Sequence, residues 1–106
     1  MTFDEIRTGI LEVAKIYGER FNVDIDQDFA ILKLYEEVGE YAQAVLIHRK
    51  KSKPEKHTTE NETQKRLGEE LADIIGMAIV NAELFGIDIQ KAIQEKWLSN
   101  ISSLNG

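Results

Sequence analysis

The sequence has no cysteine, and its only proline is Pro54. Without cysteine the chain can form no disulfide bond, thiolate metal site or thiol nucleophile, so a bound metal must be held by oxygen atoms or by histidine. The two histidines, His48 and His57, have no partner at a spacing typical of metal ligands, and we interpret both as surface residues. A metal site in this chain is therefore expected to use oxygen ligands and to favour a hard cation.

Basic residues are outnumbered by acidic ones, 13 to 19, which gives a formal net charge of -6. This balance argues against nucleic acids and anionic membranes as partners, because both require a basic surface. The chain also lacks a run of about 18 apolar residues, and residues 1–5 do not resemble the basic start of a signal peptide. We expect a cytoplasmic protein that needs a metal ion as intermediary for any phosphate-bearing substrate.

Length and composition predict one globular domain over residues 1–106, and apolar residues recur at helical spacing in four segments. The helices are expected at about 3–20, 26–48, 59–85 and 88–101, so the fold class is all-α, with a four-helix bundle architecture. The expected apolar side of the second helix consists of Phe29, Leu32, Tyr35, Val38, Ala42, Val45 and Leu46.

Several residues mark the ends of these helices or their contacts. Thr59 and Glu62 have the spacing of a capping box, Gly86 is a helix stop, and Asp88 caps the last helix. Trp97 is expected in the core or at a subunit interface. A ridge of small residues predicts close approach of another helix to the third one, at Gly68, Ala72 and Gly76.

The basic segment 49–58 separates the second helix from the third and contains the proline. Its composition predicts an exposed loop. Two interpretations remain open, namely a solvated connector and a flap that meets substrate phosphates.

The second helix carries three carboxylates in the pattern Glu36-Glu37-x-x-Glu40, all toward one side. Glu40 lies roughly 40° around the helix from Glu36 and roughly 60° from Glu37. The third helix repeats this arrangement with Glu70 and Asp73, three residues apart.

A short connection makes these two helices antiparallel neighbours, so that both acidic motifs can face one pocket. Such crowding of like charges is costly unless a divalent cation neutralises it. Oxygen ligands without a nearby histidine suit Mg²⁺, with Mn²⁺ as a substitute, whereas the Glu-x-x-His motif of di-iron bundles is absent.

At these residues the chain resembles the MazG-like family of all-α nucleoside triphosphate pyrophosphohydrolases, in which Glu-Glu-x-x-Glu is followed by Glu-x-x-Asp on the next helix. The resemblance covers most of the chain. Besides both acidic motifs, it includes the Lys33-Leu34 lead-in, the turn Phe85-Gly86-Ile87-Asp88, and Lys96-x-x-x-Asn100.

This resemblance implies hydrolysis of the α-β linkage of nucleoside triphosphates to a monophosphate and pyrophosphate, with a role in nucleotide-pool housecleaning and assembly as a homodimer or homotetramer. It implies that Mg²⁺ is held by Glu37, Glu40, Glu70 and Asp73. Glu36 and Glu37 would be the catalytic carboxylates, with Glu36 adding a ligand or orienting and deprotonating the attacking water. Lys33, Lys96 and Asn100 would bind substrate.

Two further residues of the third helix are candidates for the nucleoside end of the substrate. Asn81 lies about 20° around the helix from Glu70 and about 12 Å along the axis from Asp73, with Met77 between them. The thioether of Met77 would provide an apolar surface beneath the sugar or base. The amide of Asn81 would provide one polar group that can distinguish between nucleosides. The alternative, in which Met77 packs in the core and Asn81 is solvated, remains equally open.

Two other functions compete with this hypothesis. Phosphoribosyl-ATP pyrophosphohydrolase shares the helical fold and the acidic motifs, and differs in substrate. A non-catalytic helical module could instead use the acidic patch to contact a basic partner.

Overall fold

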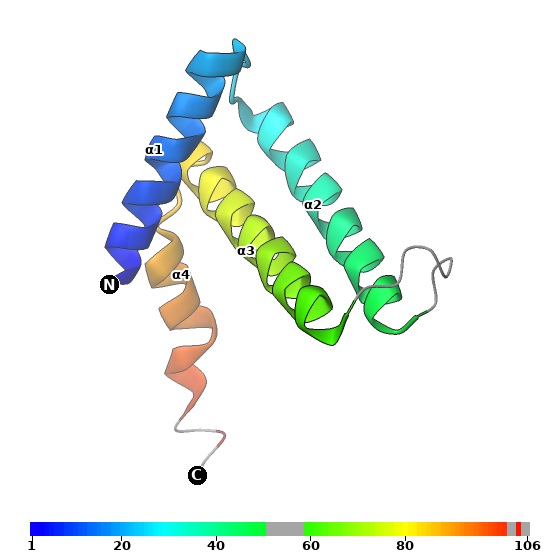
Figure 1. The fold of residues 1–106 in the computed structure, drawn as a ribbon. Coiled ribbons are helices and arrows are strands. Elements are labelled where there is room, and N and C mark those ends of the chain that lie inside the picture. Colours follow the sequence, from blue (N-terminus) through cyan, green and yellow to red (C-terminus); the bar gives the residue numbers. More distant parts are fainter. Residues whose placement is uncertain (51–58, 102–103, 105–106) are drawn as a thin grey trace. The chain divides into compact units, whose positions relative to one another are not determined.

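In the computed structural model, the described residues are 1–50, 59–101 and 104, and they are almost entirely helical. The elements are α1 (Phe3–Phe21), α2 (Gln27–His48), α3 (Glu60–Leu84), α4 (Ile89–Lys96) and a 3-10 turn, η2 (Leu98–Asn100) (Figure 1). No strand occurs in this part of the chain. The all-α prediction is therefore confirmed.

Side-chain caps fix the beginnings of α1, α3 and α4. The Glu62 amide donates to Thr59 Oγ1 at 3.2 Å and the Thr59 amide donates to Glu62 Oε2 at 3.4 Å, which confirms the predicted capping box of α3. Thr2 and Glu5 form a second capping box, at the start of α1. Asp88 caps α4 as predicted, by accepting a hydrogen bond from the Lys91 amide at 3.1 Å.

The helix α3 ends where the sequence placed its stop. Gly86 has a φ of 68°, in the left-handed region that glycine enters without strain. The amide of Ile87 reaches back to the carbonyl of Ala82 at 2.8 Å, and that of Gly86 reaches the carbonyl of Glu83 at 3.1 Å. This pattern closes the helix and starts the turn into α4.

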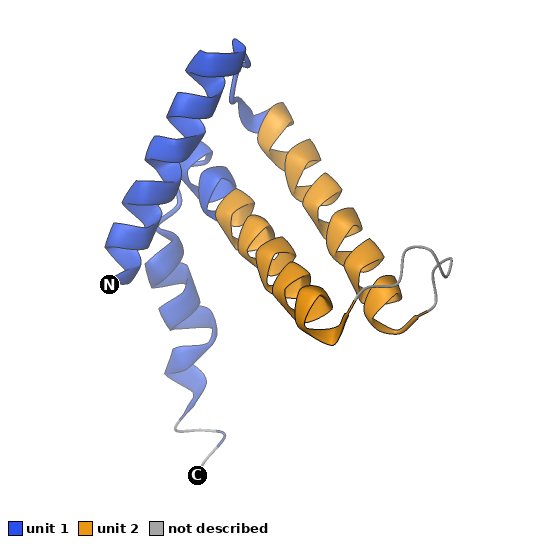
Figure 2. Ribbon diagram, viewed as in Figure 1, with its two compact units in different colours: residues 1–27, 79–106 blue, residues 28–78 orange. Residues whose placement is uncertain are grey.

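The chain divides into two compact units, one formed by residues 1–27 and 79–106 and the other by residues 28–78 (Figure 2). The first contains α1, the end of α3 and α4, and its most buried apolar residues are Ile79, Val80 and Ala82. Arg7 lies between two carboxylates there, 3.2 Å from Asp4 and 3.2 Å from Glu83. Folding of 1–106 as a single domain stays a prediction.

The last helix is shorter than predicted, because α4 ends at Lys96 and the chain continues in the tighter turn η2. Trp97 caps this end with 72% of its surface exposed, so it does not lie in a core of the described chain, and the other expected place, a subunit interface, stays a prediction. None of the helices in the described residues combines the length and apolar character that a membrane crossing requires.

Most of α2 and the first part of α3 form the second unit, where small residues line the buried side of α2. Ala30 and Ala44 are buried together with Glu37. Most of the expected apolar side of α2 is not buried in the described chain, because Tyr35 is 70% exposed and Leu32 is 67% exposed.

Candidate metal centre

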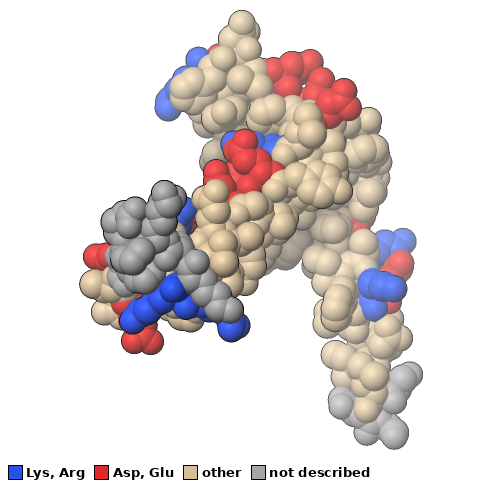
Figure 3. Space-filling view, turned by 90° about the vertical axis from the view of Figure 1, so that its right-hand side faces the viewer, with Lys and Arg blue, Asp and Glu red and all other residues tan. Residues whose placement is uncertain are grey.

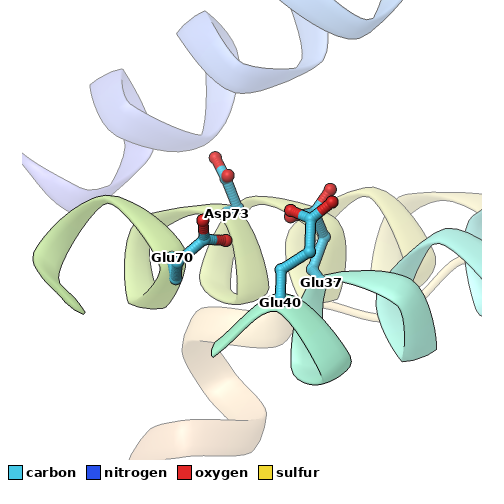
Figure 4. A group of neighbouring side chains, drawn as sticks. All are labelled: Glu37, Glu40, Glu70 and Asp73. Carbon is cyan, nitrogen blue, oxygen red and sulfur yellow. The ribbon is translucent and has the colours of Figure 1, made fainter. Parts of the chain in front are cut away.

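Four carboxylates converge between α2 and α3 (Figure 4). Glu37 and Glu40 project from α2, and Glu70 and Asp73 project from α3. One carboxylate oxygen of each residue lies within 4.8 Å of the corresponding oxygen of the other three. The structure thus brings together the four residues that the sequence grouped, and we call them the acidic quartet.

The local sequence explains this convergence. Each pair is separated by three residues, which on a helix places both side chains on the same side, one turn apart. The helices α2 and α3 run beside each other in opposite directions, so the two pairs face one another (Figure 4). All four residues belong to the unit 28–78, so the quartet is complete within one unit.

Two members of the acidic quartet have a carboxylate oxygen that is withdrawn from solvent. Glu37 is only 7% exposed. Its Oε2 atom and the Oε2 atom of Glu70 are buried and receive no hydrogen bond from any described residue. A buried carboxylate oxygen without a partner is costly, and a cation between the two helices would remove that cost.

The same surroundings change the protonation of these groups. Burial, reinforced by the charges of Glu40 and Asp73, raises the pKa of Glu37 from 4.5 to about 7, although Lys33 acts in the opposite direction. Burial and the same two charges also raise the pKa of Glu70, against the effect of Arg66. In the absence of metal, Glu37 is therefore partly protonated near neutral pH.

Two basic side chains lie at the sides of the quartet. Lys33 Nζ is 2.6 Å from Glu36 Oε1 and 3.7 Å from Glu37 Oε1. Arg66 Nε is 3.8 Å from Glu70 Oε1. Arg66 was not among the residues predicted for the site, although its position four residues before Glu70 was the available signal.

The donor set fits a divalent cation. Among the described residues, two basic side chains, Lys33 and Arg66, flank the four carboxylates, so this part of the site carries excess negative charge. Two of its oxygens also have no hydrogen-bond partner there. Mg²⁺ and Mn²⁺ prefer oxygen ligands of this kind, with water completing the octahedron. The acidic quartet can therefore hold a metal ion, and the assignment to Mg²⁺ stays a prediction.

The other predicted site residues are distributed differently. Glu36 lies outside the quartet and pairs with Lys33. Met77 is half-buried on α3, one turn after Asp73, in the same unit.

Three predicted substrate-binding residues belong to the other unit, so their position relative to the quartet stays a prediction. Asn81 lies on α3, Lys96 ends α4, and Asn100 Nδ2 donates to the Lys96 carbonyl at 3.0 Å. Of the predicted basic loop, only Arg49 and Lys50 fall within the described residues.

Comparisons of the chain with protein-family models, with curated proteins and with solved structures each found no match. The interpretation of the site therefore depends on its own residues and geometry.

Proposed function

We propose that the protein is an Mg²⁺-dependent nucleoside triphosphate pyrophosphohydrolase of the MazG-like kind, which converts nucleoside triphosphates to monophosphates and pyrophosphate. The observation that carries this proposal is the acidic quartet, in which carboxylates from two antiparallel helices meet around partly buried oxygens that have no partner. An acidic site can approach a triphosphate only through a cation, because the two are otherwise mutually repulsive.

Glu37, Glu40, Glu70 and Asp73 would hold the ion. When bound, Mg²⁺ would supply positive charge that offsets the charge of the phosphates and of the leaving pyrophosphate. The Lys33 ammonium group, next to Glu36 and Glu37, would add a second positive charge for a substrate phosphate.

The remaining carboxylate, Glu36, has a different environment. It is one residue before the most buried member of the quartet, and its pairing with Lys33 holds its side chain beside the site. A carboxylate at this place would accept the proton of the attacking water. We therefore assign Glu36 as the general base.

Water is the nucleophile in this proposal. The buried hydroxyl near the start of α3, that of Thr63, already donates a hydrogen bond to the backbone. Thr63 Oγ1 donates to the Thr59 carbonyl at 2.8 Å. His48, the histidine of the described residues, is not part of the acidic quartet, so a hydroxyl nucleophile there would lack the imidazole base that usually activates it.

The direct test is identification of the products. The chain is incubated with Mg²⁺ and a panel of ribo and deoxy triphosphates, oxidised triphosphates and phosphoribosyl-ATP, and the phosphorus-containing products are separated. We expect a monophosphate and pyrophosphate from at least one nucleoside triphosphate. Diphosphate plus inorganic phosphate would contradict the proposed bond cleavage, and turnover of phosphoribosyl-ATP alone would change the substrate assignment.

A further inference from the structure

The acidic pattern of α2 occurs a second time in α3, and a basic residue accompanies it both times. Residues 33–40 and 66–73 share one order, namely a basic residue, a leucine, a variable residue, two adjacent glutamates, two uncharged residues and a final acidic residue. The basic residue is Lys33 in the first segment and Arg66 in the second. Each comes four residues before the first quartet member on its helix and seven before the second. Both halves of the acidic quartet therefore have a cation at the same spacing.

Helix geometry places Arg66 in line with the quartet residues of α3. At about 100° and 1.5 Å per residue, Arg66 lies roughly 40° around the helix from Glu70, roughly 20° from Asp73, and about 6 Å before Glu70 along the axis. Its Nε atom is 3.8 Å from Glu70 Oε1. Arg66 therefore lies at the edge of the candidate metal centre, within the same unit 28–78.

Lys33 and Arg66 flank the acidic quartet at opposite ends. The helices α2 and α3 run in opposite directions, so the side that precedes the quartet on one helix follows it on the other (Figure 1). Lys33 precedes the quartet on α2, and Arg66 precedes it on α3. A chain of phosphates that crosses the quartet along the helices would meet Lys33 near one end and Arg66 near the other.

The two cations differ in how tightly the protein already holds them. Lys33 Nζ is 2.6 Å from Glu36 Oε1, which is a short charge-assisted hydrogen bond. Arg66 makes one ion pair with the described residues, and at 3.8 Å it is too long for a hydrogen bond. The side chain of Arg66 is 45% exposed, against 12% for its partner Glu70. The guanidinium of Arg66 can therefore turn to a phosphate from solution without losing a hydrogen bond to Glu70.

Cations beside carboxylates reduce the repulsion that a phosphate meets. On the face of the molecule in Figure 3, basic atoms lie directly against a compact group of acidic ones. At the metal centre, Lys33 and Arg66 have this relation to Glu37 and Glu70. The attraction of each cation for a phosphate offsets part of the repulsion from its neighbouring carboxylate.

The course of the reaction determines at which end the leaving group lies. The oxygen of water bonds to the α-phosphorus, and the bond from that phosphorus to the bridging oxygen breaks. The bridging oxygen leaves with the electron pair as part of pyrophosphate, and a proton of the water passes to the general base, assigned above to Glu36. The attacking and leaving oxygens lie roughly in line, on opposite sides of the phosphorus. The pyrophosphate therefore leaves at the end of the quartet away from Glu36.

We propose, on the basis of the proposed function, that Arg66 binds the β- and γ-phosphates of the substrate and hence the leaving pyrophosphate. Glu36 precedes the quartet on α2 and pairs with Lys33, so Arg66 is the cation at the opposite end. A guanidinium donates two parallel hydrogen bonds to one phosphate and stays charged throughout the physiological pH range. The negative charge that develops on the bridging oxygen lies on the Arg66 side of the α-phosphorus.

This orientation also gives the nucleoside an apolar neighbour. Met77 follows Asp73 by one turn of α3 and is half-buried, whereas Arg66 precedes Glu70 by one turn. Met77 and Arg66 lie roughly 20° apart around the helix, on either side of the quartet. The uncharged sugar and base therefore lie toward a thioether, and the terminal phosphates lie toward a guanidinium.

The test is binding of pyrophosphate and of nucleoside monophosphate to the full chain with saturating Mg²⁺, measured by isothermal titration calorimetry. Arg66→Ala is expected to weaken the binding of pyrophosphate by about tenfold or more, because charge-assisted hydrogen bonds are lost. Its binding of monophosphate should stay unchanged. Arg66→Lys keeps the charge without the paired donors, so its affinity for pyrophosphate should lie between those of Arg66→Ala and the unaltered protein. It gives the same comparison if Arg66→Ala loses helicity.

The matched control is Lys65→Ala, which removes the same charge from the adjacent position of α3. The Lys65 side chain is 80% exposed and pairs with Glu69, which lies outside the quartet. Lys65 also lies roughly 140° around the helix from Glu70. Lys65→Ala is therefore expected to bind pyrophosphate as tightly as the unaltered protein does.

A structural role of Arg66 would affect the metal ion itself. If Arg66 only held Glu70 in place, Arg66→Ala would weaken binding of Mg²⁺ in the absence of any phosphate. We expect instead that Mg²⁺ alone binds at least as tightly as before, because a positive charge beside the site has been removed. Weaker binding of Mg²⁺ alone would overturn the assignment of Arg66 to the phosphates.

The other outcomes separate this assignment from the proposed function. Three results would overturn the assignment alone while the unaltered protein still releases pyrophosphate from a triphosphate. They are no binding of pyrophosphate by the unaltered protein, equal binding by Arg66→Ala and Lys65→Ala, and a loss in Arg66→Ala that falls on the monophosphate. If the unaltered protein released no pyrophosphate from any triphosphate, the proposed function would fail, and the assignment would fail with it.

Discussion

Glu37 on α2 and Glu70 on α3 each direct a buried carboxylate oxygen into the space between the helices, where no described residue donates a hydrogen bond to it. The pKa of each group is raised, first by burial and then by the charges of Glu40 and Asp73. Without a metal ion, these two buried oxygens lower the stability of the folded protein. With a metal ion bound, the same oxygens can act as its ligands. The first two predictions follow from that difference.

Metal binding should depend on the acidic quartet and on pH. We expect Mg²⁺ and Mn²⁺ to bind, and Glu40→Gln to weaken binding at least tenfold, or about 1.4 kcal/mol. Because the pKa of Glu37 is about 7, binding must displace a proton below that pH, so affinity should rise from pH 6 to pH 8. Isothermal titration calorimetry in buffers of different ionisation enthalpy measures both quantities.

The control for metal binding is Glu69→Gln. Glu69 adjoins Glu70 in the sequence but is exposed, lies outside the quartet, and is 3.9 Å from Lys65. It removes the same charge as Glu40→Gln, but from the exposed surface of the neighbouring helix α3. If Glu69→Gln weakened metal binding as much as Glu40→Gln, binding would reflect net charge alone.

The stability of the metal-free protein should fall as pH rises. Glu37 has a pKa of about 7 in the folded protein and an ordinary value of 4.5 when unfolded, so the folded state binds more protons between these values. The free energy of unfolding should therefore decrease from pH 4.5 to above pH 7, by up to about 3 kcal/mol for this group. Urea unfolding in a chelator at several pH values measures the change.

Glu37→Gln should flatten this pH dependence and stabilise the metal-free protein at pH 8. The neighbouring variant Glu36→Gln is the control, because Glu36 is largely exposed and pairs with Lys33 outside the quartet. A Glu37→Gln protein that is less stable than the unaltered one at pH 8, with no metal present, would show that the carboxylate is needed for the fold.

Substitutions of Asn81 and of Lys96 should have different effects on substrate selection. If Asn81 contacts the base or sugar, Asn81→Ala should change the ranking of nucleotides by about tenfold or less, in keeping with one hydrogen bond of ~1 kcal/mol. Lys96→Ala should weaken the binding of all triphosphates alike, because a contact with phosphate does not depend on the base. Steady-state kinetics over the nucleotide panel give both results, and an unchanged ranking for Asn81→Ala would remove that residue from the site.

The parts of this structure that local spacing determines were predictable from the sequence. Thr59 and Glu62, or Glu70 and Asp73, are separated by one helical turn, so their relation requires only that the helix forms. The convergence of the two acidic motifs needed one more inference, that α2 and α3 are antiparallel neighbours.

The packing side of α2 was not predictable in this way. Apolar residues surround much of this helix, and a large side chain such as Tyr35 is exposed. The buried residues of α2 are instead Ala30 and Ala44, which carry weak hydrophobic signals, and the charged residue Glu37. The end of α4 was also missed, since Trp97 and Leu98 continue the apolar spacing past the point where the helix tightens into η2.

The most direct test of the acidic quartet as a catalytic metal site is pyrophosphate release from the preferred triphosphate, measured with saturating Mg²⁺ for Asp73→Asn and for Glu69→Gln. Both substitutions remove one carboxylate from α3, but only Asp73 belongs to the quartet. We expect Asp73→Asn to lose at least 99% of the turnover with its far-UV helicity intact, and Glu69→Gln to stay within about twofold of the unaltered protein. Near-normal turnover by a folded Asp73→Asn protein would contradict the proposed site.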